Sequence, residues 1–319
     1  MPDTNLRVNA KEGVVGRFAP SPTGRMHAGN IFAALMSWLT AHALGGRIVL
    51  RIEDLDIGRS RKDYADQIQR DFEFLGLTWD EGPFYQQGRE EAYQAAFEKL
   101  ADRGLVYPCF CSRADLHSAS APHRGEKLVY AGTCRRLTSE QVAEKAKQKA
   151  PAWRLKVDGG KTRYIVDDMI QGRYSQDIVQ ECGDYLVKRS DGAFAYQLAV
   201  VVDDAAQGVN LVTRGMDLLC STPQQLYLQD LLGFDHPEYC HVPLVVGQRD
   251  RRLSKRDADA GIDQLCAKYG SAEGIIGHIA YVVGLQETDD PRSCDDLLKD
   301  FDIESIEQLF VDKVQILWH

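Results

Sequence analysis

The residues best suited to chemistry lie near the N-terminus, in a turn that joins an apolar strand to a helix. Gly24 and Gly29 allow the backbone to approach a ligand where a Cβ would collide. From Ala28 onward, apolar residues recur at helical spacing, so the N-terminal amides of this helix face the turn. Such a helix start binds an anion, and His27 can donate a hydrogen bond to a phosphate oxygen. The turn therefore predicts a nucleotide phosphate site, with an ordinary turn before a capped helix as the alternative.

A second group of candidate residues is the basic loop at 247–256, which follows a predicted strand. Its cations surround Ser254 and are Arg249, Arg251, Arg252, Lys255 and Arg256. Several positive charges suit a triphosphate, and a mobile loop can close on the transition state and then release pyrophosphate. Considered alone, the run is more typical of a solvated basic loop.

A third group of candidate residues lies near the carboxyl ends of predicted strands or just beyond them: Arg17, Ala19, Ser21, Glu53, Tyr196 and Arg214. Arginine binds a carboxylate in a planar fork, and a carboxylate can bind an ammonium group. Together they suit an amino acid with an acidic side chain, such as glutamate. Structural salt bridges are the competing interpretation.

Three of the eight cysteines fall within one loop-rich segment, namely Cys109, Cys111 and Cys134. Three thiolates suit zinc, which takes a fourth ligand in a closed structural site. His117, His123 and Tyr130 compete for that place, and ligand chemistry alone favours His123. Three buried free cysteines are the alternative.

The surrounding pattern indicates an α/β fold that positions these residues. A strand at 46–56 follows the first helix and gives a β-α-β unit, whose ligand belongs at the carboxyl ends of the strands. Further strands are expected at 194–204, 209–214 and 241–246, and helices at 64–74, 90–100 and 223–232. The segment 79–83 is interpreted as a turn. Short strands and turns from 104 to 191 indicate an inserted domain, and helices are expected after Gly261.

The composition is that of a globular protein, and a contact with RNA would have to use local basic patches. The 319 residues are 44% hydrophobic and 27% charged, with a net charge of -9. This acidic balance gives no global sign of nucleic-acid binding. Neither a membrane-spanning apolar run nor a signal-peptide pattern is found, so we expect a cytoplasmic protein without membrane association.

The turn at 17–30 resembles the HIGH signature of class I aminoacyl-tRNA synthetases, in the form found in the glutamyl and glutaminyl branch. The loop from Arg252 to Arg256 resembles the KMSKS signature of the same family, with Lys255 on its second lysine. Asn30 replaces the second histidine of the first signature, and Arg256 replaces the final serine of the second. Val200 stands where full-length glutamyl enzymes usually carry an asparagine.

The resemblance implies a Rossmann-type parallel-sheet catalytic domain made of residues 1–103 and 193–256. A zinc-binding α+β domain would be inserted at 104–192, and a short helical stem-contact region would occupy 257–319. No stretch matches the anticodon-binding region of the full-length enzymes. We therefore expect the truncated branch of the family, and we expect a monomer.

The resemblance also implies a set of site residues. His27 and Lys255 would be catalytic. ATP would contact Pro20, Thr23, Gly24, His27, Gly29, Asn30, Arg252, Ser254 and Lys255. Glutamate would contact Arg17, Phe18, Ala19, Pro20, Ser21, Glu53, Tyr196 and Arg214. One structural zinc would bind Cys109, Cys111, Tyr130 and Cys134, since this branch carries a Cys-x-Cys pair with Tyr-x3-Cys, and Mg²⁺ would accompany ATP.

The expected reaction is ATP-dependent activation of L-glutamate to glutamyl adenylate without tRNA, followed by transfer to queuosine at the wobble position of aspartate tRNA. Arg135, Arg136 and Lys188 are candidate RNA phosphate contacts, although solvated surface charge explains them equally well. A short glutamyl-tRNA synthetase that charges a tRNA 3′ end is the first alternative. A small-molecule nucleotidyltransferase and a non-catalytic RNA-binding relic are the others.

Overall fold

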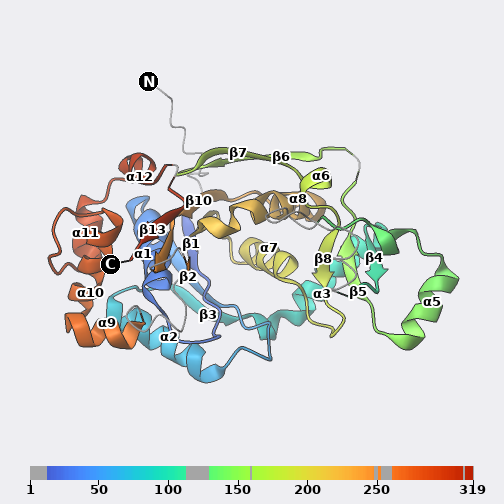
Figure 1. Ribbon diagram of the computed structural model, residues 1–319, viewed down its shortest axis with the longest axis horizontal. Coiled ribbons are helices and arrows are strands. Elements are labelled where there is room, and N and C mark those ends of the chain that lie inside the picture. The colour runs from blue at the N-terminus through green and yellow to red at the C-terminus, as the bar shows by residue number, and fades with distance from the viewer. Residues whose placement is uncertain are drawn as a thin grey trace.

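The computed structural model describes residues 13–112, 129–158, 160–247, 251–252, 261–311 and 313–318. Figure 1 shows an elongated molecule with parallel strands near its middle. The C-terminal helices lie at one end, and the cysteine-bearing segment lies at the other. None of the helices in the described ranges is long and apolar enough to cross a membrane.

A parallel arrangement of strands forms the centre of the fold. In one sheet β1 (Val15–Phe18), β2 (Arg47–Ile52) and β3 (Glu81–Tyr85) pair in that order, and β9 (Leu211–Gly215) pairs with β10 (Glu238–Val242). Asn210 joins the two groups, since its N–H donates to Val15 O at 3.1 Å and its Oδ1 accepts from Val15 N at 2.8 Å. The spatial order β3-β2-β1-β9-β10 places the topological switch point between β1 and β9, where an α/β sheet binds its ligand.

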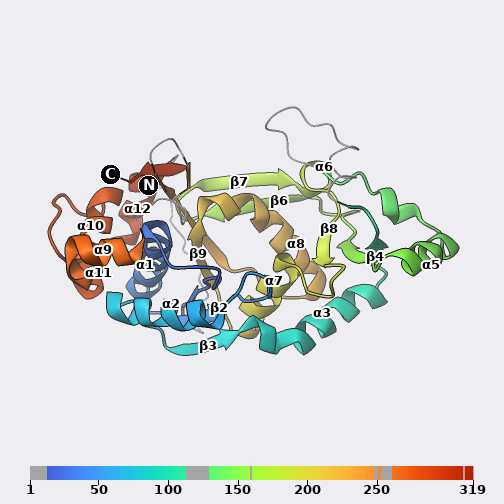
Figure 2. The same cartoon turned by 60° about the horizontal axis from the view of Figure 1, so that its bottom comes forward.

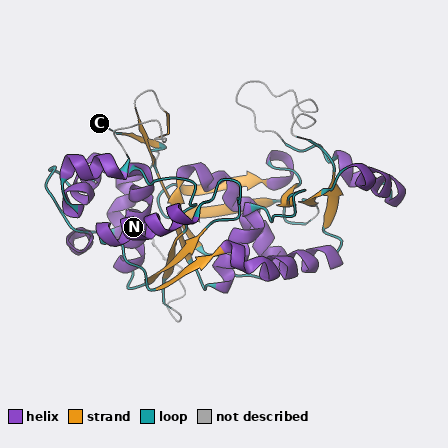
Figure 3. Cartoon of the chain, turned by 90° about the horizontal axis from the view of Figure 1, so that it is seen from below, coloured by secondary structure: helices purple, strands orange, loops and turns teal. Residues whose placement is uncertain are grey.

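Helices cover both faces of this layer, as Figure 3 shows with helices in purple and strands in orange. Along β2, Ile48 and Leu50 pack in the core that contains α1 (Ala28–Ala43), whereas Val49 packs in the core that contains α3 (Glu90–Asp102), α7 (Tyr196–Ala206) and α8 (Thr222–Leu232). This alternation follows from the two-residue period of a strand. Helix α1 is buried on most sides because the sheet and α11 (Cys294–Asp300) both pack against it.

Several expected elements are present, namely α1, β2, α3, β9, α8 and α2 (Lys62–Leu75). The strand expected at 194–204 is wrong, because the residues from Tyr196 onward form the helix α7. Its apolar stretch Leu198–Val202 is buried throughout, and periodicity alone does not separate a buried helix from a buried strand. The turn expected at 79–83 is also wrong in part, since β3 begins at Glu81.

Short antiparallel strands make up the cysteine-bearing end. β4 (Val106–Cys109), β5 (Ala152–Leu155) and β8 (Tyr185–Lys188) form one sheet, and α5 (Ser139–Gln148) projects beside it. The hairpin of β6 (Arg163–Asp168) and β7 (Gly172–Asp177) is followed by α6 (Ile178–Glu181). Figure 2 shows this hairpin running along α8, and β6 also contacts β10. Residues of the 104–192 segment therefore touch the parallel core directly.

The C-terminal part contains α9 (Ile262–Tyr269), α10 (Ala272–Val283), α11 (Cys294–Asp300) and α12 (Ile303–Phe310). The expected strand at 241–246 is divided at Pro243 into the end of β10 and β11 (Leu244–Gly247). β11 pairs with β12 (Arg251–Arg252) and with β13 (Gln315–Leu317). The sequence predicted only helices after Gly261. This prediction is wrong in part, because β13 is a strand that completes this small sheet.

Candidate functional site

A cavity of about 700 Å³ opens at the carboxyl ends of β1, β2 and β9. Both the phosphate turn and the predicted amino-acid site contribute to its wall. Twelve of the residues expected to contact ATP or glutamate line it: Arg17, Phe18, Ala19, Pro20, Ser21, Thr23, Gly24, His27, Asn30, Glu53, Tyr196 and Arg214. Gly29 does not line it, although a Cβ there would lie 3.3 Å from the His27 ring. The fold thus brings four segments that are distant in the sequence to one place, namely 17–30, Glu53, Tyr196 and Arg214.

Arg17 lies at the end of β1 and is 4% exposed. Its Nη1 donates to Thr213 O at 2.8 Å, while its Nε lies 3.8 Å from the Asp204 carboxylate. Within the described parts of the chain, that buried Nε has no hydrogen-bond partner. Burial lowers the pKa of the Arg17 guanidinium, and Asp204 opposes this shift. The group therefore retains capacity to bind an anion in the cavity.

Arg214 lies at the end of β9 and is more fully bonded. Its Nε donates to His241 Nε2 at 3.1 Å, and its Nη2 donates to Thr222 and Gln225 at 2.8 Å each. The Nη1 contact with the Tyr196 hydroxyl is longer, at 3.5 Å. Nη1 is consequently the guanidinium nitrogen best able to bind a ligand carboxylate.

Glu53 follows β2 and supplies the negative charge of the site. One oxygen accepts from Arg51 Nη2 at 3.2 Å. Burial raises the pKa of the Glu53 carboxyl, and the positive charges of Arg51 and Arg17 oppose that rise. A ligand ammonium group would add a further positive charge and stabilise the ionised form.

The charged residues behind Glu53 were missed in the sequence analysis. Arg51 is fully buried, and its Nη1 donates to Asp204 at 2.7 Å. Asp203 accepts from Arg89, Tyr93 and Gln86. A usable signal was present, since charges within the apolar stretches of β2 and α7 need buried partners.

The start of α1 closes the phosphate side of the cavity. His27 is the residue before the helix, and its N–H donates to Asn30 Oδ1 at 3.2 Å. Asn30 therefore caps the helix start in addition to lining the cavity. Ser254 and Lys255, which were expected to contact ATP, lie outside the described residues, while the Arg252 backbone pairs with Val246 in the β11–β12 hairpin.

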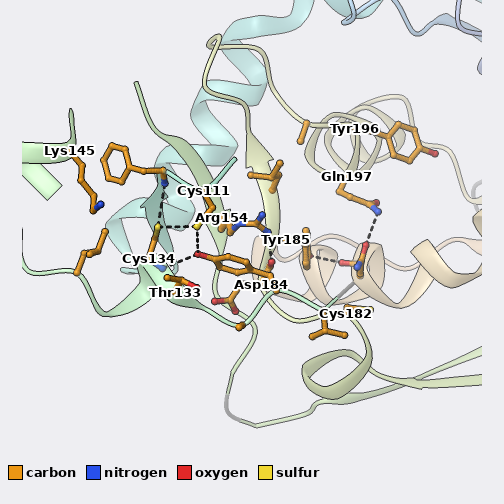
Figure 4. A pocket seen from close by; sticks show the side chains of 18 residues that line it. Cys111, Thr133, Cys134, Lys145, Arg154, Cys182, Asp184, Tyr185, Tyr196 and Gln197 are labelled. Carbon is orange, nitrogen blue, oxygen red and sulfur yellow. Dashed lines mark hydrogen bonds between the residues drawn. The ribbon is translucent and has the colours of Figure 1, made fainter. Parts of the chain in front are cut away.

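The three cysteines gather at the far end of the molecule, where Figure 4 shows Cys111 and Cys134 close together. All three sulfur atoms lie within 4.8 Å of one another, and the Cys111 and Cys134 sulfurs are 3.5 Å apart. The Tyr130 hydroxyl lies 3.4 Å from Cys109 Sγ and 3.6 Å from Cys111 Sγ. A zinc–sulfur bond of about 2.3 Å would separate tetrahedral sulfurs by about 3.8 Å, so the donor set has the size of a zinc site.

The surroundings of Cys109 favour a metal-binding thiolate. Burial would raise the pKa of this thiol, yet hydrogen bonds with Tyr130 and Arg154 hold the pKa below its ordinary value. Arg154 Nε lies 3.3 Å from Cys109 Sγ, and its guanidinium stacks on the Tyr130 ring at 3.9 Å. His117 and His123, the other candidate ligands, lie outside the described residues.

A second cavity, of about 860 Å³, separates the cysteine cluster from α7. Figure 4 shows Cys111 and Cys134 on one side of it and Tyr196 with Gln197 on the other. Tyr196 lines this cavity as well as the first one. The two cavities therefore adjoin, and a large second substrate could enter beside the amino-acid site.

Three positions expected to matter have other surroundings. Val200 is 1% exposed in the hydrophobic core and does not line either cavity. Arg135 forms ion pairs with Asp158 and Asp184, and Lys188 donates to Gln94 at 3.0 Å. These contacts give both cations structural partners.

Residues 13–274 match the family model of the class I tRNA synthetases (E and Q), catalytic domain. The chain belongs to this family. Membership makes it a ligase-type enzyme of the tRNA synthetase class, with the Rossmann-like catalytic fold that the parallel strands display.

Relatives with curated names cover most of this synthetase-family chain. The Glutamyl-Q tRNA(Asp) synthetase of Symbiobacterium thermophilum is 43% identical over 305 residues, which cover 91% of this chain and 93% of the relative. That of Thiobacillus denitrificans is 48% identical over 243 residues, covering 76% and 77%. A crystal structure of glutamate-tRNA synthetase from Elizabethkingia anophelis shares the fold, with a TM-score of 0.79 at 24% identity over 97% of this chain and 68% of that one.

Proposed function

We propose that this enzyme activates L-glutamate with ATP and transfers the glutamyl group to queuosine in tRNA(Asp). The observation that carries the proposal is the arrangement of Arg17, Arg214 and Glu53 around one cavity beside the start of α1. Relatives named for this activity, at 43% and 48% identity, support the choice of acceptor.

The charges of the cavity match the three ionised groups of glutamate. Arg17 and Arg214 bind the side-chain carboxylate, with Tyr196 and Ser21 beside them, and Glu53 binds the ammonium group. The α-carboxylate then points toward the phosphate turn. Glutamine would lack the negative charge that two buried guanidinium groups require, so it would bind poorly.

Activation joins glutamate to the α-phosphate of ATP. An oxygen of the glutamate α-carboxylate attacks the α-phosphorus, the bond to the bridging oxygen of the β-phosphate breaks, and pyrophosphate leaves. His27 and the α1 amides bind phosphate oxygens on one side, and Lys255 with Ser254 and Arg252 act from the basic loop. Mg²⁺ bound with ATP would supply further positive charge to the phosphates.

Transfer uses the adjoining cavity. A hydroxyl oxygen of the queuosine ring attacks the carbonyl carbon of glutamyl adenylate and gives up its proton. An ester bond forms, the bond between the carbonyl carbon and the phosphate oxygen breaks, and AMP leaves. The amino-acid cavity and the larger cavity share Tyr196, which places an RNA nucleotide next to the activated carboxyl group. The protein acts as a monomer in this proposal.

A structural zinc is part of the same proposal. Cys109, Cys111, Cys134 and Tyr130 would hold it, and the metal would tie the end of β4 to the turn at 130–134. This turn forms one wall of the larger cavity. The closed donor set leaves no position for substrate, so the metal supplies rigidity and takes no part in the reaction.

Glutamate-dependent exchange of pyrophosphate into ATP, measured without tRNA, tests the activation step. Wild-type protein should show exchange, and Arg214→Gln should reduce kcat/KM for glutamate roughly 10- to 100-fold through loss of a charged hydrogen bond. Arg47→Gln is the matched control, since Arg47 is a surface residue that pairs with Glu81 at the opposite end of β2. Absence of exchange with wild type, or equal exchange by both variants, would refute the proposed site.

A further inference from the structure

We propose that Asp168 and His241 are positioning residues for Arg214. The Asp168 carboxylate fixes the tautomer of His241, and His241 in this tautomer holds Arg214 in place for the glutamate carboxylate. The inference rests on the proposed function, because that function assigns Arg214 to glutamate. It concerns two residues that do not line the cavity.

Three separate elements meet in this arrangement. Asp168 ends β6, His241 lies in β10 and Arg214 lies in β9. His241 Nδ1 is 2.6 Å from Asp168 Oδ2, and His241 Nε2 is 3.1 Å from Arg214 Nε. The side chains of Asp168 and His241 are both fully buried, so water does not compete for these bonds.

The position of the proton follows from the donors and acceptors. Arginine has no acceptor atom, so Arg214 Nε must donate, and His241 Nε2 must carry a lone pair. The remaining ring proton then lies on Nδ1 and is donated to Asp168. The carboxylate also accepts from the backbone N–H groups of Ile170 and Gln171, which fixes its orientation.

This tautomer determines which part of Arg214 faces the ligand. Thr222 and Gln225 hold Nη2, and His241 holds Nε, which leaves Nη1 beside Tyr196 at the cavity. If His241 carried its proton on Nε2, two N–H groups would oppose each other at 3.1 Å. The Thr222 hydroxyl oxygen, 3.3 Å from Nε2, would then have to accept from the ring as well as from Arg214 Nη2. Arg214 would then have to turn away, and Nη1 would leave its position.

The electrostatic environment supports a neutral imidazole. Burial lowers the pKa of His241; the hydrogen bond to Asp168 opposes this, while the positive charges of Arg214 and Arg17 lower the pKa further. His241 is therefore uncharged near neutral pH, as an acceptor for arginine must be.

Asp168→Asn tests the inference in the same exchange assay. The asparagine oxygen should take the place of Oδ1, which accepts from the backbone N–H groups of Ile170, Gln171 and His241. The side-chain NH₂ group would then take the place of Oδ2 and donate to His241 Nδ1. The ring proton would then move to Nε2, opposite Arg214. We expect the KM for glutamate to rise about tenfold or more, with the KM for ATP changed by less than about twofold.

The chain contains a matched control. His278 Nδ1 lies 2.9 Å from Asp289 Oδ1, and no arginine contact of His278 is found in the described structure. Asp289→Asn therefore removes a carboxylate from a similar pair and should leave the KM for glutamate unchanged. Thermal melting of both variants reports on folding.

A second pair of variants separates positioning from general stability. The side-chain amide introduced by His241→Gln would offer an oxygen to Arg214 whatever its neighbour does. His241→Gln should therefore retain a near wild-type KM, whereas His241→Leu should raise it about tenfold. Adding Asp168→Asn to His241→Gln should then have little further effect. If Asp168→Asn does not fold, the His241 pair alone decides.

The possible failures can be told apart. Wild-type protein without glutamate-dependent exchange would overturn the proposed function itself. Wild-type exchange together with an unchanged KM in Asp168→Asn would overturn only the positioning role. Equal KM values for His241→Gln and His241→Leu would also overturn the positioning role. So would a rise in the KM for glutamate that Asp168→Asn causes equally in wild-type protein and in His241→Gln.

Discussion

Buried charge defines the candidate site at the scale of single residues. Arg17, Arg51 and Arg214 are at most 5% exposed, and carboxylates or amide oxygens lie against them. Removing one partner from such a group costs more than the pair contributes, because the remaining charge stays buried. The network therefore holds ligand-binding groups in place before glutamate arrives, which reduces the cost of ordering them.

Glu53 gives a pH-dependent prediction. Its pKa is raised by burial, so lowering the pH protonates Glu53 before an exposed glutamate would be protonated. The protonated form cannot pair with the substrate ammonium, and the KM for glutamate should rise toward the acid end of a series from about pH 5 to 8.

Glu53→Gln provides the comparison for this series. It should have a high KM throughout, and the ratio of its KM to that of wild type should shrink as the pH falls. Because both proteins retain His241, that ratio isolates Glu53. A ratio independent of pH would contradict the assigned role.

Metal content tests the cysteine cluster. Cys134→Ala removes one of the sulfur donors, so the purified protein should contain little zinc by elemental mass spectrometry, while wild type should contain about one zinc per chain. Cys220→Ala is the control. Cys220 lies outside the cluster, so this variant should retain the metal. Equal zinc in the two variants would exclude the proposed donor set.

At the scale of elements, the sequence predicted helices with a strong apolar period and missed elements whose identity depends on tertiary contacts. Helix α1 follows directly from its spacing and its glycine-containing start. Helix α7 was expected to be a strand because Leu198–Val202 is apolar throughout. The contacts of α7 with α8 and α3 in the folded chain favour a helix here, and the apolar pattern of the sequence does not reveal these contacts.

The same distinction applies to the site. Arg17, Glu53 and Arg214 could be found because they follow or end apolar segments and match a family pattern. Asp168 and His241 could not, since they lie 73 positions apart and their contact depends on how the β6–β7 hairpin packs on β10. Sequence patterns give the residues at strand ends, but not the partners that orient them.

Helix α10 allows a test of packing at this scale. A Cβ added at Gly277 would lie 2.1 Å from Asp290 O and 2.9 Å from Arg292 N, so Gly277→Ala must displace backbone. We expect it to lower the free energy of unfolding by about 1–3 kcal/mol and the melting temperature by several degrees. Gly88→Ala meets no atom within 4 Å and should melt near wild type. Equal melting of the two variants would contradict this packing.

At the scale of the whole molecule, the proposed sites of activation and transfer lie side by side. The parallel strands end at the proposed amino-acid and phosphate site, and residues of the cysteine-bearing segment line the opposite wall of the adjoining cavity (Figure 4). An RNA that enters this larger cavity can present a hydroxyl to the adenylate across Tyr196. The net charge of -9 means that such an RNA must be bound through local basic residues rather than a general positive field.

The identity of the acceptor is the central claim, and it can be tested by transfer of radiolabelled glutamate to tRNA(Asp) prepared with and without queuosine. A queuosine-containing tRNA that lacks its 3′-terminal adenosine serves as the matched substrate. We predict that both queuosine-containing tRNAs accept glutamate and that the unmodified tRNA does not. Equal labelling of unmodified tRNA, or loss of labelling when the 3′ adenosine is removed, would contradict the account and indicate charging of the tRNA 3′ end.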